Sequence, residues 1–234
     1  MNTKNSQKIR RMVILAVFAA LAYVVMLVIH IKVPPFLTLD VKDTVITLCG
    51  LYFGPLAALV ISVLVPVMEL SVSDTGWYGL VMNMLGSVAF SVTASLIYKW
   101  KKTLLGAILG LVSAAFVMTG VMLLANLFIT PYYMGVAVAD VRAMIPALLL
   151  PFNLIKGILN VGLVLLLYKH IGVALRKAGF LPKKAAVQGN ETPVANEHKL
   201  LRTVLVSLAA TVLIACAMVI IFVVLGGSFG FGVS

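Results

Sequence analysis

Charged side chains are scarce in this sequence of 234 residues. Asp, Glu, Lys and Arg together make up 11% of the chain, whereas hydrophobic residues make up 62%. An average soluble domain carries roughly 25% charged residues, many of which cover its surface. So little charge excludes an ordinary soluble domain. Together with long apolar runs, it predicts an all-α integral membrane protein.

Residues that bind metals or carry out catalysis are also rare. The two cysteines, Cys49 and Cys216, lie in apolar runs without a CxxC pattern, so we predict packing roles rather than a disulfide or a zinc site. Glu69 is the only Glu before the polar segment near residue 190, and no HExxH pattern or Walker motif occurs. The sequence therefore predicts no catalytic residue, no metal site, no cofactor and no ATP hydrolysis by this chain.

Basic residues stand mainly at the ends of the apolar runs. With the N-terminus inside, 14 of the 18 Lys and Arg residues fall on the inner side, three fall in outer loops, and Lys156 lies within the membrane. This asymmetry follows the positive-inside rule. It predicts a multi-pass plasma-membrane protein with a cytoplasmic N-terminus and an external C-terminus. It also explains the net charge of +11, so that charge does not indicate binding to nucleic acid.

The apolar runs predict seven spans, at residues 12–29, 45–52, 56–68, 80–98, 104–129, 144–168 and 200–225. Loops are expected at residues 30–44, 69–78 and 130–142. The second and third spans are interpreted as two short helices joined at Phe53-Gly54-Pro55, since one helix would contain an interior proline. A single kinked helix is the alternative, but it would place the basic cluster at residues 99–102 on the wrong side.

The chain divides by composition into a membrane domain and an additional helix. Residues 1–178 form the predicted six-span domain, residues 179–199 a polar cytoplasmic linker, residues 200–226 a seventh helix and residues 227–234 a short tail. The seventh helix has no charge after Arg202 and no polar stripe. We therefore expect a lipid-facing appendage, and we expect ligand binding to survive when the chain ends at about Lys184.

The sixth span carries an unusual polar stripe. Asn153, Lys156 and Asn160 lie on one helix face within residues 146–160, at about 100° per residue, and their flanks are almost wholly apolar. A charged Lys near the membrane centre costs roughly 2.5 to 3.5 kcal/mol, and such residues pair inside a bundle or mark a substrate path. The stripe indicates a polar ligand pocket or, alternatively, polar contacts that join two helices.

Other polar residues that are not basic anchors collect on the predicted outer side. Together with the sixth span they indicate one outward pocket, whose mouth aromatic side chains could line unless they form an interfacial belt. The polar set is Asp40, Lys42, Asp43, Thr44, Glu69, Asp74, Asn83, Asn126, Asn153 and Lys156, and the aromatic set is Trp77, Tyr78, Tyr132 and Tyr133.

Several stretches resemble a known family. They are FLTLDVKDT in the first loop, LCGLYFGPLAALVIS at the second and third spans, ANLFITPYY late in the fifth span and LLPFNLIKGILNVGLVLLLYK in the sixth. In this order they resemble the substrate-binding S component of energy-coupling factor (ECF) vitamin transporters. The run PFNLIKG is most similar to the riboflavin-binding branch. The resemblance covers about residues 8–178, and the linker and seventh helix depart from it.

The resemblance implies a function, partners and a site. It implies riboflavin as transported substrate in an outward-facing pocket, with uptake driven by an ECF transmembrane coupling protein and two ATP-binding subunits in the lipid membrane. The alternatives are an S component for another vitamin or small molecule, and a structural membrane protein or small membrane enzyme. The expected substrate-binding residues are Asn153, Lys156, Asn126, Lys42, Asp43, Thr44, Glu69, Asn83 and Tyr78, and Ala16 and Ala20 match the family's AxxxA signature for the coupling interface.

Overall fold

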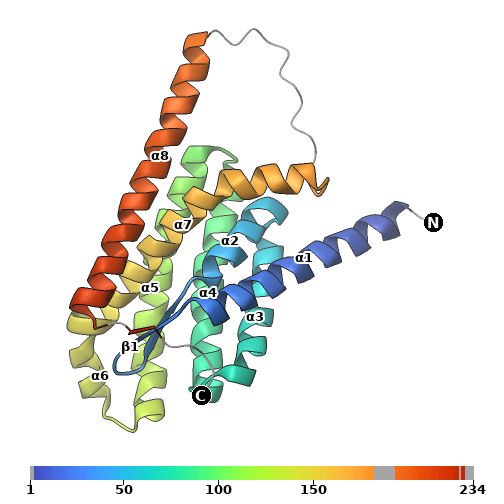
Figure 1. Ribbon diagram of the computed structural model, residues 1–234. Helices are drawn as coiled ribbons and strands as arrows, with labels where there is room; N and C mark the ends of the chain where they lie inside the picture. Colours follow the sequence, from blue (N-terminus) through green and yellow to red (C-terminus); the bar gives the residue numbers. More distant parts are fainter. Residues whose placement is uncertain (1–2, 182–192, 227, 230–234) are drawn as a thin grey trace.

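The computed structural model describes residues 3–181, 193–226 and 228–229, and most of them are helical (Figure 1). The helices pack into a bundle, and a small three-stranded sheet lies at the end of the bundle that also carries α6. The eight α-helices are α1 (Thr3–Val28), α2 (Lys42–Phe53), α3 (Pro55–Glu69), α4 (Gly76–Trp100), α5 (Leu104–Met134), α6 (Val138–Met144), α7 (Leu150–Lys177) and α8 (Pro193–Val219). The shorter elements are β1 (His30–Val33), β2 (Leu37–Asp40), β3 (Ser228–Phe229), a 3₁₀ turn at Leu70–Val72 and π turns at Ile145–Leu149 and Ile220–Val224.

Six helical segments in the described part of the chain are long and apolar enough to cross a membrane. This confirms the predicted all-α membrane fold. α2 is not among the six, because its 12 residues extend only about 18 Å. Ten of those residues are buried, so α2 is a short helix enclosed by the bundle. The six segments are Lys8–Val28, Pro55–Val72, Gly76–Trp100, Leu104–Met134, Val138–Lys177 and Leu205–Val223.

The predicted break between the second and third helices is confirmed. α2 ends at Phe53, Gly54 has a φ of 98°, and α3 begins at Pro55. Glycine adopts that left-handed conformation without a Cβ clash. Proline suits the first helical position because its missing N–H would have no partner there. The dipeptide therefore stops one helix and starts the next.

The expected loop at residues 30–44 contains a β-hairpin. β1 pairs antiparallel with β2, with Val33 opposite Leu37 and His30 opposite Asp40. Ile31 and Val33 are buried while Lys32 between them is exposed, which is the alternation of a half-buried strand. Pro34 and Pro35 lie in the turn between β1 and β2.

The expected loop at residues 130–142 is wrong at both ends. α5 continues through Pro131 to Met134 and stops where Gly135 takes a left-handed φ of 66°. α6 then begins at Val138, and a π turn at Ile145–Leu149 joins it to α7. Pro131 supplies no backbone N–H, yet the helix continues for three residues beyond it.

Small residues let the helices around α7 approach closely. A Cβ on Gly157 would lie 2.9 Å from the Cβ of Ala115 in α5, so only glycine fits there. On another face of α7, a Cβ on Gly162 would lie 3.0 Å from Ile214 of α8. α7 is therefore held between α5 and α8.

α8 is more than a lipid-facing appendage. Ala210, Ala217 and Ile221 are buried, although much of the remaining surface of α8 is exposed. The predicted packing role holds for buried Cys49 but not for Cys216, which is exposed. The predicted linker falls largely on residues outside the described part of the chain, and α8 begins at Pro193.

Candidate functional site

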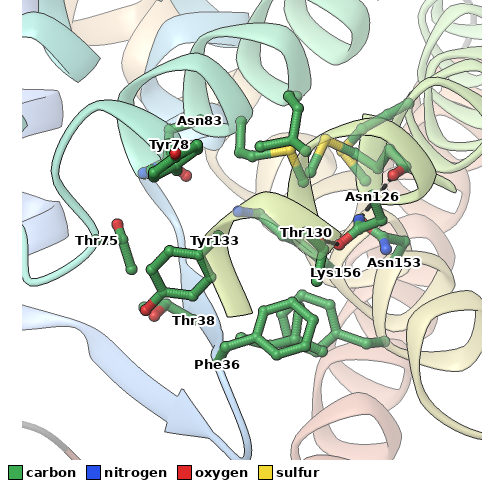
Figure 2. A pocket seen from close by; sticks show the side chains of 18 residues that line it. Phe36, Thr38, Thr75, Tyr78, Asn83, Asn126, Thr130, Tyr133, Asn153 and Lys156 are labelled. Atoms are coloured by element: carbon green, nitrogen blue, oxygen red, sulfur yellow. Dashed lines mark hydrogen bonds between the residues drawn. The ribbon is translucent and has the colours of Figure 1, made fainter. Parts of the chain in front are cut away.

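One cavity lies among the β1–β2 hairpin, the first turns of α4, the second half of α5 and the start of α7 (Figure 2). It has a volume of about 770 Å³, which includes space open to solvent. Its walls combine apolar, aromatic and amide side chains, as is usual for small-molecule sites. The lining residues are Phe36, Leu37, Thr38, Thr75, Tyr78, Gly79, Met82, Asn83, Gly86, Met118, Met122, Asn126, Ile129, Thr130, Tyr133, Phe152, Asn153 and Lys156.

Five of the nine predicted substrate-binding residues line this cavity. They come from three helices: Tyr78 and Asn83 from α4, Asn126 from α5, and Asn153 and Lys156 from α7. Figure 2 shows Asn126, Thr130 and Asn153 gathered on one side of the cavity and Tyr78 and Asn83 on the other. The fold therefore brings together polar groups that are up to 78 positions apart in the sequence.

The two asparagines of α5 and α7 are anchored to their own helices. Asn153 donates from Nδ2 to the carbonyl oxygen of Leu149 at 2.8 Å, and Asn126 donates to that of Met122 at 2.7 Å. Thr130 donates to Oδ1 of Asn126 at 2.8 Å. A primary amide has two N–H donors and an oxygen acceptor. Each side chain is thus fixed in position and retains a donor for a ligand.

Lys156 stands between the cavity and a buried ionic cluster. Its Nζ lies 3.2 Å from Oδ2 of Asp40 and 3.8 Å from Oδ2 of Asp43. Lys42 Nζ lies 3.0 Å from the same oxygen of Asp40 and 2.9 Å from Oε2 of Glu69. Buried charges require such partners, because an unpaired charge loses its hydration without compensation. The cluster links the hairpin, α2, α3 and α7.

Asp40 is the carboxylate that both lysines share. Burial by itself would raise the pKa of this carboxyl, but the ammonium groups of Lys156 and Lys42 outweigh it and hold the pKa well below its usual range. Asp40 is therefore charged at neutral pH. It fixes the end of β2 to α7.

The other four predicted residues lie outside the cavity lining, in the packing around it. Lys42 and Glu69 pair with each other, and Asp43 accepts a hydrogen bond from Ser87. Thr44 donates to Oδ1 of Asn160 at 2.7 Å, which joins α2 to α7. Asn83, which lines the cavity, donates to Oε1 of Glu69 at 2.9 Å and so connects these residues to the cavity wall.

Asn160, the third member of the predicted polar stripe, joins two helices and does not line the cavity. Asn160 is fully buried, accepts from Thr44, and donates to the carbonyl oxygen of Lys156 at 3.0 Å. The stripe on α7 thus divides. Asn153 and Lys156 line the cavity, whereas Asn160 joins α7 to α2.

Aromatic side chains line one part of the cavity. Tyr133 contacts Tyr78 and Phe36, with ring centroids 5.9 and 6.4 Å apart. Trp77 and Tyr132 are 71% and 78% exposed, which suits the interfacial belt rather than the pocket. The predicted aromatic set therefore separates into two lining residues and two belt residues.

Sequence reasoning missed the contribution of the hairpin tip. Phe36, Leu37 and Thr38 line the cavity, yet only the end of the first loop was expected there. Asp40 was counted among the outer polar residues without a role. The available signal for Asp40 was Lys156 itself, since a Lys within a membrane span requires a carboxylate partner.

Ala16 and Ala20 are both exposed on α1. They belong to a face that also exposes Val13, Val17 and Leu21, whereas Ala19 on the other side is buried. The AxxxA pair therefore contributes no packing to the bundle. It lies on an apolar surface that lipid or a second membrane protein can cover.

Comparisons with known proteins agree with this architecture. The family model described as "ECF transporter, substrate-specific component" matches residues 10–168. The chain is 32% identical to the riboflavin transporter RibU of Staphylococcus aureus (strain TCH60) over 184 residues, which is 74% of this chain and 96% of that protein. It also resembles a solved structure published as the S component of a bacterial ECF transporter, with a TM-score of 0.63 and 30% identity, over 72% of this chain and 99% of the other.

Proposed function

The chain belongs to the substrate-specific components of ECF transporters, and we propose that it binds riboflavin in the cavity at the hairpin end and takes part in its uptake. The observation that carries this proposal is the mixed lining of the cavity, which combines amide side chains and a lysine with methionine and aromatic side chains. Riboflavin presents the same two kinds of surface, because its ring system has polar atoms at one end and a dimethylbenzene at the other.

The polar residues that we assign to the flavin ring are Asn126, Asn153 and Lys156. A flavin ring presents carbonyl oxygens, ring nitrogens and one imide N–H along its polar edge. The amide of Asn153 offers both a donor and an acceptor, which complements an imide. Lys156 adds a charged donor, and a charged hydrogen bond in a site with little water is worth about 1.5 to 3 kcal/mol.

The apolar side chains of the lining suit the remainder of the ring. Met82, Met118 and Met122 bring thioethers to the cavity, and Phe36 and Phe152 add aromatic faces. Methionine is polarizable and adapts to a flat aromatic surface, with favourable sulfur to ring contacts. The lining also includes Thr38, Thr75 and Thr130, whose hydroxyl groups we assign to the ribityl chain. In this assignment Lys42, Asp43, Thr44 and Glu69 lie outside the cavity lining and hold the binding residues in position.

Uptake requires partners that this chain does not supply. We place the cavity on the outer face, with the N-terminus inside and β3 outside, because the basic residues collect at the opposite end of the helices. The exposed face of α1 with Ala16 and Ala20 is proposed as the contact with a transmembrane coupling protein, which two ATP-binding subunits energise. Small residues there allow close helix approach.

The identity of the substrate can be tested without labelled ligand. Protein purified from cells grown with riboflavin should carry flavin, detectable by its yellow absorbance after denaturation. Excess riboflavin should prevent binding of a fluorescent flavin, whereas thiamine and biotin should not. Competition by another vitamin at lower concentration would instead assign the cavity to that vitamin. A purified protein that binds none of them would favour a structural role.

A further inference from the structure

The C-terminal part of the chain, α8 and β3, lies beyond residue 168, where the family match ends. The relatives are aligned over 96% and 99% of their own lengths, yet they cover only about three quarters of this chain. The described part of the chain nevertheless shows this segment in contact with two elements of the cavity wall, α7 and the β1–β2 hairpin.

α8 packs along the face of α7 that is turned away from α5. The Cβ position of Gly162 lies only 3.2 Å from the carbonyl oxygen of Ala210, so the two helix backbones nearly touch. Further along, Ala217 of α8 and Ile221 of the π turn that follows α8 belong to one buried cluster with Leu159 of α7. Small residues at a helix crossing of this kind permit extensive van der Waals contact within a membrane.

The same buried cluster includes the hairpin. Ile31, Val33 and Leu39 are almost completely buried in it, together with Ile221 after the end of α8 and Phe152 of α7. Phe152 also lines the cavity. One continuous apolar core therefore connects α8 to the hairpin and to the cavity wall.

β3 adds a strand to the free edge of the hairpin. The strand order is β2-β1-β3, with Ser228 opposite Lys32 and Phe229 opposite Ile31 (Figure 1). In Figure 1 the red end of α8 descends to the level of β1, where the short third strand crosses the hairpin. A two-stranded hairpin alone is only marginally stable, and a third strand with an apolar face stabilises it.

The hairpin is a wall of the cavity formed by short strands, whereas the other walls belong to the long helices α4, α5 and α7. Its tip supplies Phe36, Leu37 and Thr38 to the lining, and Asp40 at its base pairs with Lys156. Its exposed surface is otherwise tied to the bundle by the ion pair between Lys32 and Asp74, which is exposed and therefore weak. A movement of the hairpin would open this wall of the cavity.

We propose that α8 and β3 form a brace that holds the β1–β2 hairpin against α7 and thereby slows the exchange of bound ligand. This inference rests on the proposed function for the ligand, but the brace itself is a property of the ligand-free protein. The sequence alone favoured the opposite result, because the seventh helix carries no polar stripe that would reveal a role near the site.

The first test removes β3 and keeps α8. A chain that ends at Leu225 should release riboflavin roughly threefold to tenfold faster than the full chain, the effect expected from losing one or two backbone hydrogen bonds. The matched control is Leu208→Ala with Val212→Ala, which alters the exposed face of α8 and should leave the release rate unchanged. Equal release rates for the full and shortened chains would overturn the proposal.

A second measurement does not depend on the ligand. Amide hydrogen exchange of residues 30–40 in the ligand-free protein should be faster in the shortened chain than in the full chain. Unchanged exchange there would show that β3 does not hold the hairpin, and it would overturn the brace. If the full chain binds no riboflavin but its hairpin exchange still depends on β3, the proposed ligand is wrong and the brace stands.

A disulfide across the β1–β3 pair supplies the reverse test. Lys32→Cys with Ser228→Cys, in a Cys216→Ser background, places two sulfurs on directly opposed residues at a spacing that a disulfide can bridge. Oxidation should slow riboflavin release below the rate of the full chain, and reduction should restore it. Lys32→Cys alone is the control. Faster release in the oxidised form would contradict the proposal.

Discussion

Lys156 connects the two halves of the site at the scale of single residues. Its position within an apolar span made it predictable, since a Lys there needs both a partner and a reason to be retained. The partner could not be read from the sequence, because Asp40 lies 116 positions away and only the fold brings it within 3.2 Å. The sequence indicated how far along a membrane span each polar residue lies, but not which neighbour its side chain faces. Lys42 and Glu69 were therefore assigned to the ligand although they pair with each other.

Replacing this lysine tests its direct role. Lys156→Ala should weaken riboflavin binding roughly tenfold to 150-fold, because loss of a charged hydrogen bond costs about 1.5 to 3 kcal/mol. Fluorescence titration of the purified variant measures the effect. Lys169→Ala is the matched control, since Lys169 lies on the same helix but is exposed at its other end. Wild-type affinity in a folded Lys156→Ala protein would assign Lys156 to helix packing alone.

Asp40 should matter more for stability than for ligand contact. Asp40→Asn leaves Lys42 and Lys156 without their shared carboxylate, and breaking a buried ion pair in this way costs about 3 to 5 kcal/mol. Thermal unfolding of the ligand-free protein should therefore shift to a clearly lower temperature. Asp74→Asn removes an exposed pair of the same hairpin and should cost no more than about 1 kcal/mol. Equal shifts for the two variants would contradict the proposed role of the buried cluster.

At the scale of elements, predictions succeeded where local chemistry is decisive. The Gly54-Pro55 pair fixed the break between α2 and α3, because each residue has a conformational preference that no neighbour needs to supply. The end of α5 was misplaced, because the predicted span ended at residue 129 whereas the helix continues through Pro131 to Met134. The packing of α8 was missed because Ala210 and Ala217 look the same in a lipid-facing helix as in a helix crossing.

The exposed face of α1 can be separated from the binding site. Ala16→Trp or Ala20→Trp should abolish riboflavin uptake by cells that contain the coupling protein and ATP-binding subunits, because a bulky side chain prevents close helix approach. Binding by the purified variants should stay unchanged, since neither residue lines the cavity. Leu124→Trp, on the exposed surface of α5, is the control for a bulky residue in lipid. Parallel loss of binding and uptake would show that this face serves the bundle instead.

At the scale of the whole molecule, charge and polarity are divided between the two ends of the helices. Asp40, Asp43, Glu69, Asp74 and Asp140 lie at the end with the hairpin and α6, whereas basic residues such as Lys99, Lys102 and Arg176 lie at the opposite end. This division was predictable from the sequence, because span counting and the positive-inside rule use only the order of residues. The cavity itself required the fold, since its walls come from four separate segments.

The most direct test of the account is a titration of the purified full-length protein with riboflavin, followed by the quenching of flavin fluorescence. The account predicts saturable binding of one riboflavin per chain with a Kd below about 1 μM, equivalent to about 8 kcal/mol of binding free energy. It also predicts that Asn153→Leu, which removes the amide from the cavity wall but keeps its size, weakens this binding. Absence of saturable quenching by a folded protein, or undiminished affinity in Asn153→Leu and Lys156→Ala together, would contradict the proposal that this cavity binds riboflavin.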